Sequence, residues 1–222
     1  DIEGDSLTPS VIWVMCWENI RDPTKKGHCI GYDQIREFFT KTQGSVYVGH
    51  NILKFDGPVL NRLAGTSLSV DSLIDTLVLC TLYSPSLNGG HSLGAWGTRI
   101  GFEKDAFNDW AKLSDEMIAY CYQDVKVTAE LFRRTTKVLN KIGFSELSCY
   151  IQHHITAILF QQETNGFCFD RQRGIKLLEE LRGVAKGLED QVQRLFPAER
   201  KYVATRQIRK KGGEYTKIYL ED

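Results

Sequence analysis

Four acidic residues of this chain have the types and the order expected of a metal-binding set. Asp1 and Glu3 open the sequence, Asp56 ends the run HNILKFD, and Asp124 ends the run YCYQD. If the fold brings these carboxylates together, they form an all-oxygen cage suited to two divalent cations of the Mg²⁺ or Mn²⁺ type. A cage of this kind supports hydrolysis of phosphodiester bonds.

Taken singly, each of these residues also has an ordinary structural interpretation. Asp1 and Glu3 share one face if they lie on a strand, because side chains alternate along a strand, but acidic strand ends are common. Asp56 resembles an ordinary aspartate at the start of a helix. Tyr120 and Asp124 are four residues apart, so they share a helix face and could form a structural hydrogen bond. Asp75 precedes an apolar helical run, which favours a helix N-cap over a metal ligand.

The bulk composition limits the class of protein only loosely. The chain has 222 residues, of which 42% are hydrophobic, and this length suits one sizeable α/β domain with an extension. Lys and Arg number 28, as do Asp and Glu, so no global basic field indicates a nucleic-acid partner. The balance does not exclude DNA, because a nuclease site is itself acidic.

The cysteine pattern and the hydropathy of the sequence indicate where in the cell the protein is located. No Cys-x-x-Cys pair occurs, and most of the cysteines lie in apolar runs, which favours reduced core residues over disulfides: Cys16, Cys29, Cys80, Cys121, Cys149 and Cys168. No stretch approaches the roughly 20 apolar residues needed to cross a bilayer, and no signal peptide opens the chain. We therefore expect a soluble intracellular protein without a membrane partner.

Strands and helices alternate in the first half of the chain. Residues 11–17 are β-branched and aromatic, and we expect residues 29–32 to pair with them across the polar segment between. Helix-spaced apolar residues follow at 34–42, and short strands are predicted at 45–48 and 70–74. This alternation predicts a mixed sheet covered by helices.

Longer helices are predicted further along the chain. Ser114 is a good N-cap for a helix that runs to about Gly143. Residues 151–163 and 173–195 have helical patterns, and residues 202–220 alternate around a glycine pair, which predicts a hairpin. The basic residues of this tail suit either a solvated hairpin or contacts with duplex phosphates.

The ordered runs DIEGDSL, HNILKFD and YCYQD resemble the three motifs of the DEDD exonuclease superfamily, in its tyrosine-bearing subgroup. The runs IDTLVL, HSLGAWG and QQETNGFCFD look like those of the 3′–5′ proofreading domain of family A DNA polymerases from T-odd podoviruses. The resemblance implies a ribonuclease H-like mixed β-sheet flanked by helices, with a helical C-terminal extension. Residues 1–143 would be the exonuclease domain, and residues 144–222 a helical extension and hairpin resembling the start of the polymerase domain.

The resemblance also assigns roles to the acidic residues. Asp1, Glu3 and Asp124 are implied to hold one Mg²⁺ or Mn²⁺ ion, and Asp1 to bridge to a second. Asp56 would hold that second ion largely through water. Because two cations can stabilise both the attacking and the leaving oxygen, these roles agree with phosphodiester hydrolysis.

Four further residues are implied to act on water or DNA. Tyr120 would orient the attacking water together with Glu3; with a reference pKa of about 10, it is a poor base at neutral pH. Leu7 would wedge against the terminal base. His50 and Asn51 would line the path of the DNA strand.

The resemblance implies release of nucleoside 5′-monophosphates from a single-stranded or frayed DNA 3′ end, in the service of a polymerase domain or a separate polymerase chain. Unpairing costs least where pairing is already broken, which favours mismatched ends. We expect residues upstream of Asp1 and a location in the cytoplasm of a phage-infected bacterium. An RNA-trimming exonuclease of the same subgroup and a catalytically idle DNA-positioning module remain alternatives.

Overall fold

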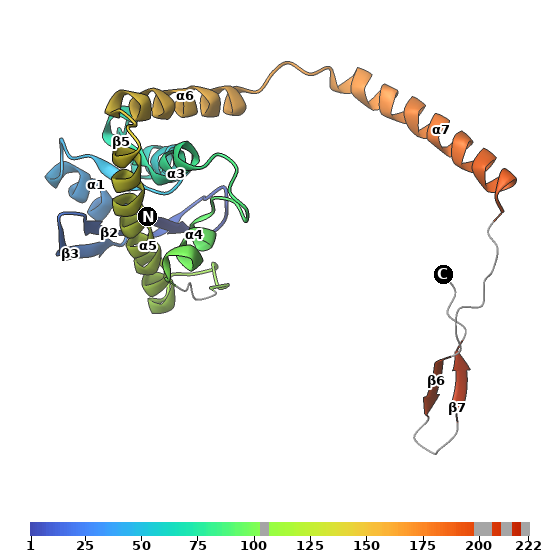
Figure 1. Ribbon diagram of the computed structural model, residues 1–222, viewed down its shortest axis with the longest axis horizontal. Helices are drawn as coiled ribbons and strands as arrows, with labels where there is room; N and C mark the ends of the chain where they lie inside the picture. Colours follow the sequence, from blue (N-terminus) through green and yellow to red (C-terminus); the bar gives the residue numbers. More distant parts are fainter. Residues whose placement is uncertain (103–106, 198–205, 210–214, 219–222) are drawn as a thin grey trace. The chain divides into compact units, whose positions relative to one another are not determined.

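The computed structural model describes residues 1–102, 107–197, 206–209 and 215–218. It contains two compact units, Asp1–Gly166 and Phe167–Asp222, and each is considered by itself (Figure 1). The first unit consists of helices packed on small sheets, and the second contains a long helix and a two-stranded hairpin. The predicted α/β class with a helical C-terminal part is therefore confirmed.

The first sheet is antiparallel and has the order β1-β2-β3. Strand β1 spans Ile2–Gly4, β2 spans Ile12–Asn19 and β3 spans Asp22–Cys29. The central strand β2 is buried on both faces, because its neighbouring residues Met15 and Val14 belong to different core clusters. Glu3 lies opposite Val14 in the register, so the first acidic motif is fixed to the best-buried strand of the sheet.

The partner of β2 differs from the sequence prediction. Residues 29–32 were expected to pair with it, but the polar segment Asp22–Cys29 forms the strand instead. The side-chain oxygen of Asn19 makes this tight turn possible, since it accepts the N–H groups of Arg21 at 2.9 Å and Asp22 at 3.1 Å. Strand β3 lies at the edge of the sheet, where most of its side chains are exposed, so it carries no alternating apolar pattern that the sequence could reveal.

A second, parallel sheet pairs β4 (Tyr47–Gly49) with β5 (Leu73–Asp75), which confirms a short strand near each predicted position. The strand predicted at 70–74 begins only at Leu73, because the residues before it form a 3₁₀-helix. The connection between them contains α2 (Asp56–Val59), the π-helix η1 (Leu60–Ala64) and the 3₁₀-helix η2 (Val70–Ser72). Within the described residues the parallel pair and the antiparallel strands are separate hydrogen-bonded sheets. Helix α5 contacts strands of both and so joins them in one layered unit.

Helices cover the antiparallel sheet on both faces, as predicted. On one face lie α1 (Tyr32–Lys41), α2 and η1, which contribute Ile35, Val59 and Leu60 to the core. On the other lies α5 (Asp115–Lys141), whose Met117, Cys121 and Val125 pack against β2. The predicted cap of α5 is confirmed, because Ser114 Oγ accepts the Met117 N–H at 3.1 Å.

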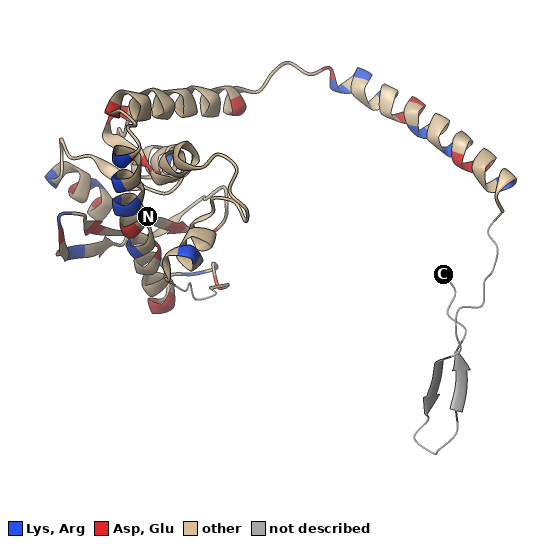
Figure 2. Cartoon of the chain, viewed as in Figure 1, with Lys and Arg blue, Asp and Glu red and all other residues tan. Residues whose placement is uncertain are grey.

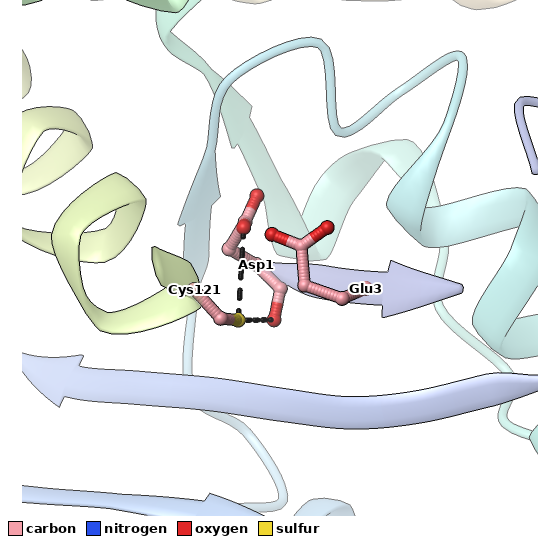
Figure 3. Close-up of side chains that lie close together, drawn as sticks. All are labelled: Asp1, Glu3 and Cys121. Carbon is pink, nitrogen blue, oxygen red and sulfur yellow. Dashed lines mark hydrogen bonds between the residues drawn. The ribbon is translucent and has the colours of Figure 1, made fainter. Parts of the chain in front are cut away.

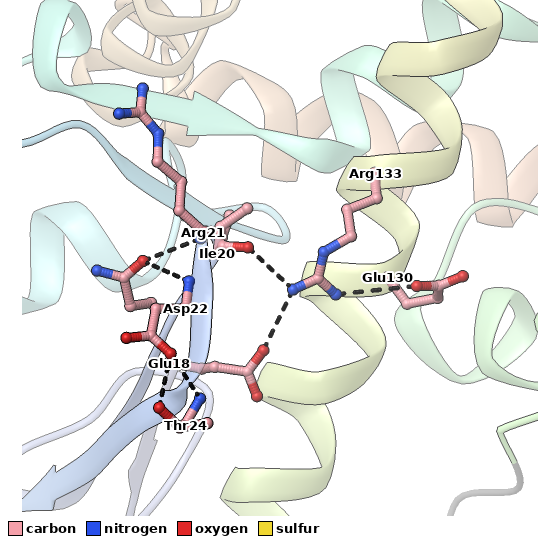
Figure 4. A network of polar contacts seen from close by, with 8 residues as sticks. Glu18, Ile20, Arg21, Asp22, Thr24, Glu130 and Arg133 are labelled. Carbon is pink, nitrogen blue, oxygen red and sulfur yellow. Dashed lines mark hydrogen bonds and ion pairs between the residues drawn. The ribbon is translucent and has the colours of Figure 1, made fainter.

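A polar network attaches the β2–β3 hairpin to α5 (Figure 4). The Arg133 guanidinium donates to Glu18 Oε1 at 3.4 Å and to the carbonyl oxygen of Ile20 at 3.2 Å. Glu130 lies 3.8 Å from the same guanidinium. Because the Arg133 side chain is 37% exposed, solvent weakens these ion pairs. We infer that the network orients the hairpin more than it stabilises the fold.

Three more helices complete the first unit: α3 (Thr76–Tyr83), α4 (Leu93–Ile100) and α6 (Glu146–Asn165). Helix α3 contacts both α5 and α6, and α6 also contacts η2. These contacts place α6 in the first compact unit, which extends to Gly166, beyond the boundary expected at residue 143. A change of function at residue 143 stays a prediction, because compactness does not show where function changes.

The second unit contains α7 (Arg171–Leu195), with basic and acidic side chains interspersed along its length (Figure 2). Its N-cap is Asp170, whose Oδ1 accepts the Arg173 N–H at 3.0 Å. Strands β6 (Arg206–Arg209) and β7 (Tyr215–Ile218) pair antiparallel, which confirms the predicted hairpin. The side chains of this basic hairpin lie outside the described part of the chain.

Two further expectations are tested by the structure. All six cysteines are free, as predicted, but only Cys16, Cys29, Cys80 and Cys121 are buried core residues. Cys149 is partly buried and Cys168 is exposed, so the prediction of a core position was wrong for Cys168. No helix in the described ranges combines the length and the apolar character needed to cross a bilayer.

Asp75 connects three elements of the first unit through its carboxylate. Its Oδ1 accepts the Leu77 N–H at 2.9 Å, which confirms the predicted N-cap of α3. The same oxygen accepts the Asn51 N–H at 2.8 Å, and Oδ2 accepts the Leu53 N–H at 3.2 Å. Asp75 is only 1% exposed, so water cannot replace these bonds.

We predict that Asp75→Ala lowers the free energy of unfolding by about 3 kcal/mol or more, since each buried donor left without an acceptor costs about 1 to 3 kcal/mol. Urea unfolding at neutral pH measures the loss. Asp71→Ala is the matched control, because the Asp71 side chain is 66% exposed and its ion pair with His154 is screened by solvent. Equal stability of the two variants would contradict the role of Asp75.

Candidate metal centre

Asp1 and Glu3 flank the buried Ile2 at the start of β1. The alternation of side chains along this short segment puts both carboxylates on the same side of the strand (Figure 3). Glu3 is only 8% exposed, although glutamate is almost never buried unless its charge is compensated. The buried carboxylate of Glu3 thus lies beside the half-buried carboxylate of Asp1, an arrangement that a cation would stabilise.

The thiol of Cys121 extends from α5 to the same place. Its Sγ donates to the backbone oxygen of Asp1 at 3.6 Å and to Asp1 Oδ2 at 3.7 Å. One potential ligand atom from each of Asp1, Glu3 and Cys121 lies within 4.8 Å of the others. The sequence predicted Cys121 only as a core residue. Its position between Tyr120 and Asp124 is the sequence signal that could have predicted its place beside Asp1.

The chemistry of Cys121 indicates a neutral thiol in the metal-free protein. A hydrogen bond with Cys16 and burial raise its pKa well above the usual value for a cysteine. A protonated thiol is a poor metal ligand, because the thiolate is the form that binds metals. The oxygen atoms of Asp1 and Glu3 are then the stronger donors in this cluster, and oxygen donors favour hard cations such as Mg²⁺.

Asp56, from a later part of the chain, contacts the same strand β1. It is the first residue of α2, it is 4% exposed, and its Oδ1 accepts the backbone N–H of Ile2 at 3.1 Å. Ile2 lies between Asp1 and Glu3, so this bond places a third carboxylate beside the first acidic motif. Burial raises the pKa of Asp56, because a charged carboxylate is poorly solvated there.

The chain approaches Asp56 through a tight turn that requires glycine. The N–H of Gly57 donates to the Ile52 carbonyl oxygen at 2.9 Å. A Cβ atom at position 57 would lie 2.9 Å from that same oxygen. Any larger residue at position 57 would therefore displace the backbone next to Asp56.

Asp124 lies on α5, three residues after Cys121, and is 6% exposed. Residues three apart share one face of a helix. Because the Cys121 thiol contacts Asp1, this face of α5 is turned towards the acidic start of β1. Among the described residues, however, the cluster of ligand atoms within 4.8 Å of one another comprises only Asp1, Glu3 and Cys121. Joint metal binding by Asp124, Asp56 and the first acidic motif therefore stays a prediction.

Tyr120 is half-buried and lies in an aromatic cluster. Its ring is 5.6 Å from the ring of Phe107 and 5.6 Å from that of Trp110, measured between centroids. The backbone oxygen of Trp110 accepts the indole N–H of Trp13 at 3.1 Å, which attaches the cluster to β2. The rings of Phe107 and Trp110 therefore hold the ring of Tyr120 in place.

The three residues predicted to contact the substrate have different surroundings. Leu7 is 93% exposed in the loop after β1. His50 is half-buried, with its Nδ1 2.9 Å from Thr76 Oγ1. Asn51 adopts a left-handed backbone conformation, with a φ of 63°, and its N–H donates to Asp75. The roles of all three residues in substrate binding remain predictions.

Comparison with known proteins adds a separate observation. The sequence matches no protein-family model. It is similar to the DNA-directed DNA polymerase of Escherichia phage T7, with 28% identity over 195 residues that cover 63% of this chain and 27% of the relative. The DNA-directed DNA polymerase of Enterobacteria phage T3 gives the same identity and coverage.

The chain thus spans about a quarter of the length of these curated relatives. The predicted resemblance to phage DNA polymerases is confirmed at the level of sequence similarity. The assignment to an exonuclease of the tyrosine-bearing subgroup stays a prediction, as do the metal ligands.

The buried position of Asp56 predicts a pH dependence of stability. Because its pKa is raised in the folded protein, protonation of Asp56 stabilises the fold. This contribution to the free energy of unfolding is fully present below the unfolded pKa of about 3.9 and is lost as pH rises through the folded pKa. In EDTA, the stability of the parent should therefore fall relative to Asp56→Asn as pH rises from about 4 through the raised pKa of Asp56.

Urea unfolding of both proteins across this pH range measures the difference. Asp33→Asn is the control, because the Asp33 side chain is 98% exposed and should contribute no such slope. A parent that gains stability relative to Asp56→Asn as pH rises would show that Asp56 is stabilised as a carboxylate without metal.

Proposed function

We propose that this chain is a metal-dependent 3′–5′ exonuclease that hydrolyses DNA from its 3′ end to nucleoside 5′-monophosphates, and that it proofreads for a phage DNA polymerase. One observation carries the proposal: the backbone N–H of Ile2 donates to Asp56, which places Asp56 beside the Asp1 and Glu3 pair. Asp124 is buried on α5, one turn after Cys121, whose thiol contacts Asp1. These contacts support a site to which β1, α2 and α5 would each contribute a carboxylate.

The residues present fit a pair of hard divalent cations. Asp1, Glu3 and Asp124 would hold one Mg²⁺ or Mn²⁺ ion, Asp1 would also contact the second, and Asp56 would bind that ion mainly through water. Carboxylate oxygens are the preferred ligands of these ions. When bound, the ions supply charge stabilisation at the attacking and leaving oxygens and lower the pKa of a water molecule.

The protein side chains would position the reactants. In this proposal Tyr120 and Glu3 orient the attacking water by hydrogen bonds, and the aromatic cluster around Tyr120 keeps its ring in place. Leu7, which is 93% exposed, is available to wedge against the terminal base. His50 and Asn51 would line the path of the strand on the segment that leads to Asp56. Correct orientation of this kind accounts for a large part of the rate in such reactions.

The preferred substrate would be a single-stranded or frayed DNA 3′ end. A paired base must be unstacked before its phosphodiester can enter an acidic site, and this costs least at a mismatch. The similarity to phage DNA polymerases supports DNA as the substrate and a polymerase domain or separate polymerase chain as the partner. On this proposal the protein acts in the cytoplasm of the phage-infected bacterium.

A nuclease assay tests the proposal directly. End-labelled single-stranded DNA, a mismatched primer–template and RNA are incubated with Mg²⁺, and the products are resolved by length. We expect ladders that shorten from the 3′ end, DNA faster than RNA, and no cleavage in EDTA. Asp124→Ala should reduce cleavage below detection, while its melting temperature in EDTA equals or exceeds that of the parent because one repelling charge is gone.

The outcomes of this assay separate the alternatives. Faster trimming of RNA would favour an exoribonuclease, and DNA binding without cleavage would favour an idle positioning module. A large loss of stability in metal-free Asp124→Ala would identify Asp124 as a structural residue instead of a metal ligand.

A second prediction concerns the water-orienting role of Tyr120. Tyr120→Phe should keep the rise in melting temperature caused by Mg²⁺, because the carboxylates are intact. Its hydrolysis rate should fall by about 10- to 100-fold, because a hydrogen bond to the attacking water is lost.

Tyr122→Phe is the matched control on the same helix. The hydroxyl of Tyr122 lies 3.1 Å from His28 Nδ1, on β3. This variant should hydrolyse DNA at the parent rate. If Tyr120→Phe also kept the parent rate, Tyr120 would have no role in positioning water.

A further inference from the structure

His153 of α6 makes a buried hydrogen bond that the sequence did not indicate. Its side chain is 5% exposed, and its Nε2 lies 2.8 Å from the backbone nitrogen of Asp75. A backbone N–H can only donate, so Nε2 is the acceptor and carries no proton. Nδ1 then carries the proton and donates to the Cys149 carbonyl oxygen at 2.7 Å. Both ring nitrogens of a neutral imidazole are therefore engaged.

Hydrogen bonds and short backbone segments together connect His153 with the candidate metal centre. The N–H of Asp75 donates to His153, and the carboxylate of Asp75 accepts the N–H groups of Asn51 and Leu53. The segment that contains these two residues ends at Asp56, which binds the N–H of Ile2. Helix α6 thus supports the segment 50–56 through Asp75.

The surface contacts of α6 with this region are weaker. Lys54 Nζ lies 2.8 Å from a carboxylate oxygen of Glu163, and His154 Nε2 lies 3.2 Å from Asp71. Both pairs include a side chain that is more than 60% exposed, so solvent screens them. The buried bond of His153 is therefore the contact whose loss should matter most.

We propose that His153 is a positioning residue of the exonuclease site, which holds the segment 50–56 where Asp56 meets β1 and where His50 and Asn51 face the DNA strand. This inference rests on the proposed function. Without the acceptor at position 153, the Asp75 N–H would be buried and unpaired. The carboxylate of Asp75 would then shift, and it would no longer hold Asn51 in its left-handed conformation.

Two substitutions of similar size test whether the acceptor atom Nε2 of His153 is needed. In His153→Gln, the side-chain oxygen reaches the position of Nε2 and can still accept the Asp75 N–H. In His153→Asn, the shorter amide reaches only the position of Nδ1, so the Asp75 N–H loses its acceptor. Metal-dependent hydrolysis of single-stranded DNA is measured for both variants across a range of DNA and Mg²⁺ concentrations.

We expect His153→Asn to raise the KM for DNA and the Mg²⁺ concentration for half-maximal rate by about tenfold. Its kcat at saturation should change less, because Asp1, Glu3 and Tyr120 are untouched. His153→Gln should restore both values to near those of the parent. His154→Gln is the neighbouring surface control and should change neither value.

Hydrogen exchange in the absence of metal and DNA gives a readout that is independent of activity. The amides of Asn51, Leu53 and Asp75 should exchange faster in His153→Asn than in the parent, and His153→Gln should protect them again. If both variants kept parent exchange and parent KM, the proposal would be overturned. The proposal would also be overturned if His153→Asn lowered kcat and the melting temperature but left KM unchanged, and if His153→Gln lost kcat to the same extent.

Failure of the proposed function can be told apart from failure of this inference. A parent protein that does not hydrolyse DNA would refute the exonuclease, whatever the variants do. Unchanged exchange of the three amides in His153→Asn would refute the positioning role of His153 even in an active enzyme.

Discussion

The burial of carboxylates at the start of β1 is the constraint on which the candidate site depends. Asp56 and Glu3 are 4% and 8% exposed, and Asp1 contributes to the same cluster. Such groups are costly to bury, and a protein tolerates them only where hydrogen bonds or cations compensate the charge. The Asp56 carboxylate accepts a backbone N–H, and the Asp1 carboxylate accepts a thiol. These donors fix the positions of the two carboxylates at the start of β1.

Asp75 is buried like Asp56, but its hydrogen bonds give it a structural role. Both of its oxygens accept backbone N–H groups, from Asn51, Leu53 and Leu77. Its carboxylate is therefore already engaged by the fold and organises the segment on which Asp56 lies. Asp75 thus shapes the segment from which Asp56 reaches the N–H of Ile2, where we propose that it binds a cation.

The proposed substrate is a polyanion, and this gives the cations a second purpose. The chain has 28 basic and 28 acidic residues, so its net charge provides no long-range attraction for DNA. A cluster of carboxylates by itself would repel the phosphate that it has to cleave. Bound cations would remove this repulsion at the one place where the phosphate must enter, so binding and catalysis would share the same requirement for metal.

The sequence by itself determined the parts whose signals are local. The helix at 115–141 was found from its cap and its apolar period, the parallel strands from short apolar runs, and Asp75 as an N-cap from its position before a helix. The order of the acidic motifs also follows from sequence, and it led to the resemblance with phage polymerases. Tertiary structure alone decided contacts between distant segments. It placed polar residues 22–29 in an edge strand, brought Cys121 to Asp1 across 120 positions, and set His153 against Asp75 across 78. Such pairings depend on which buried donors meet which acceptors when helices pack on sheets, and no local pattern of residues encodes that.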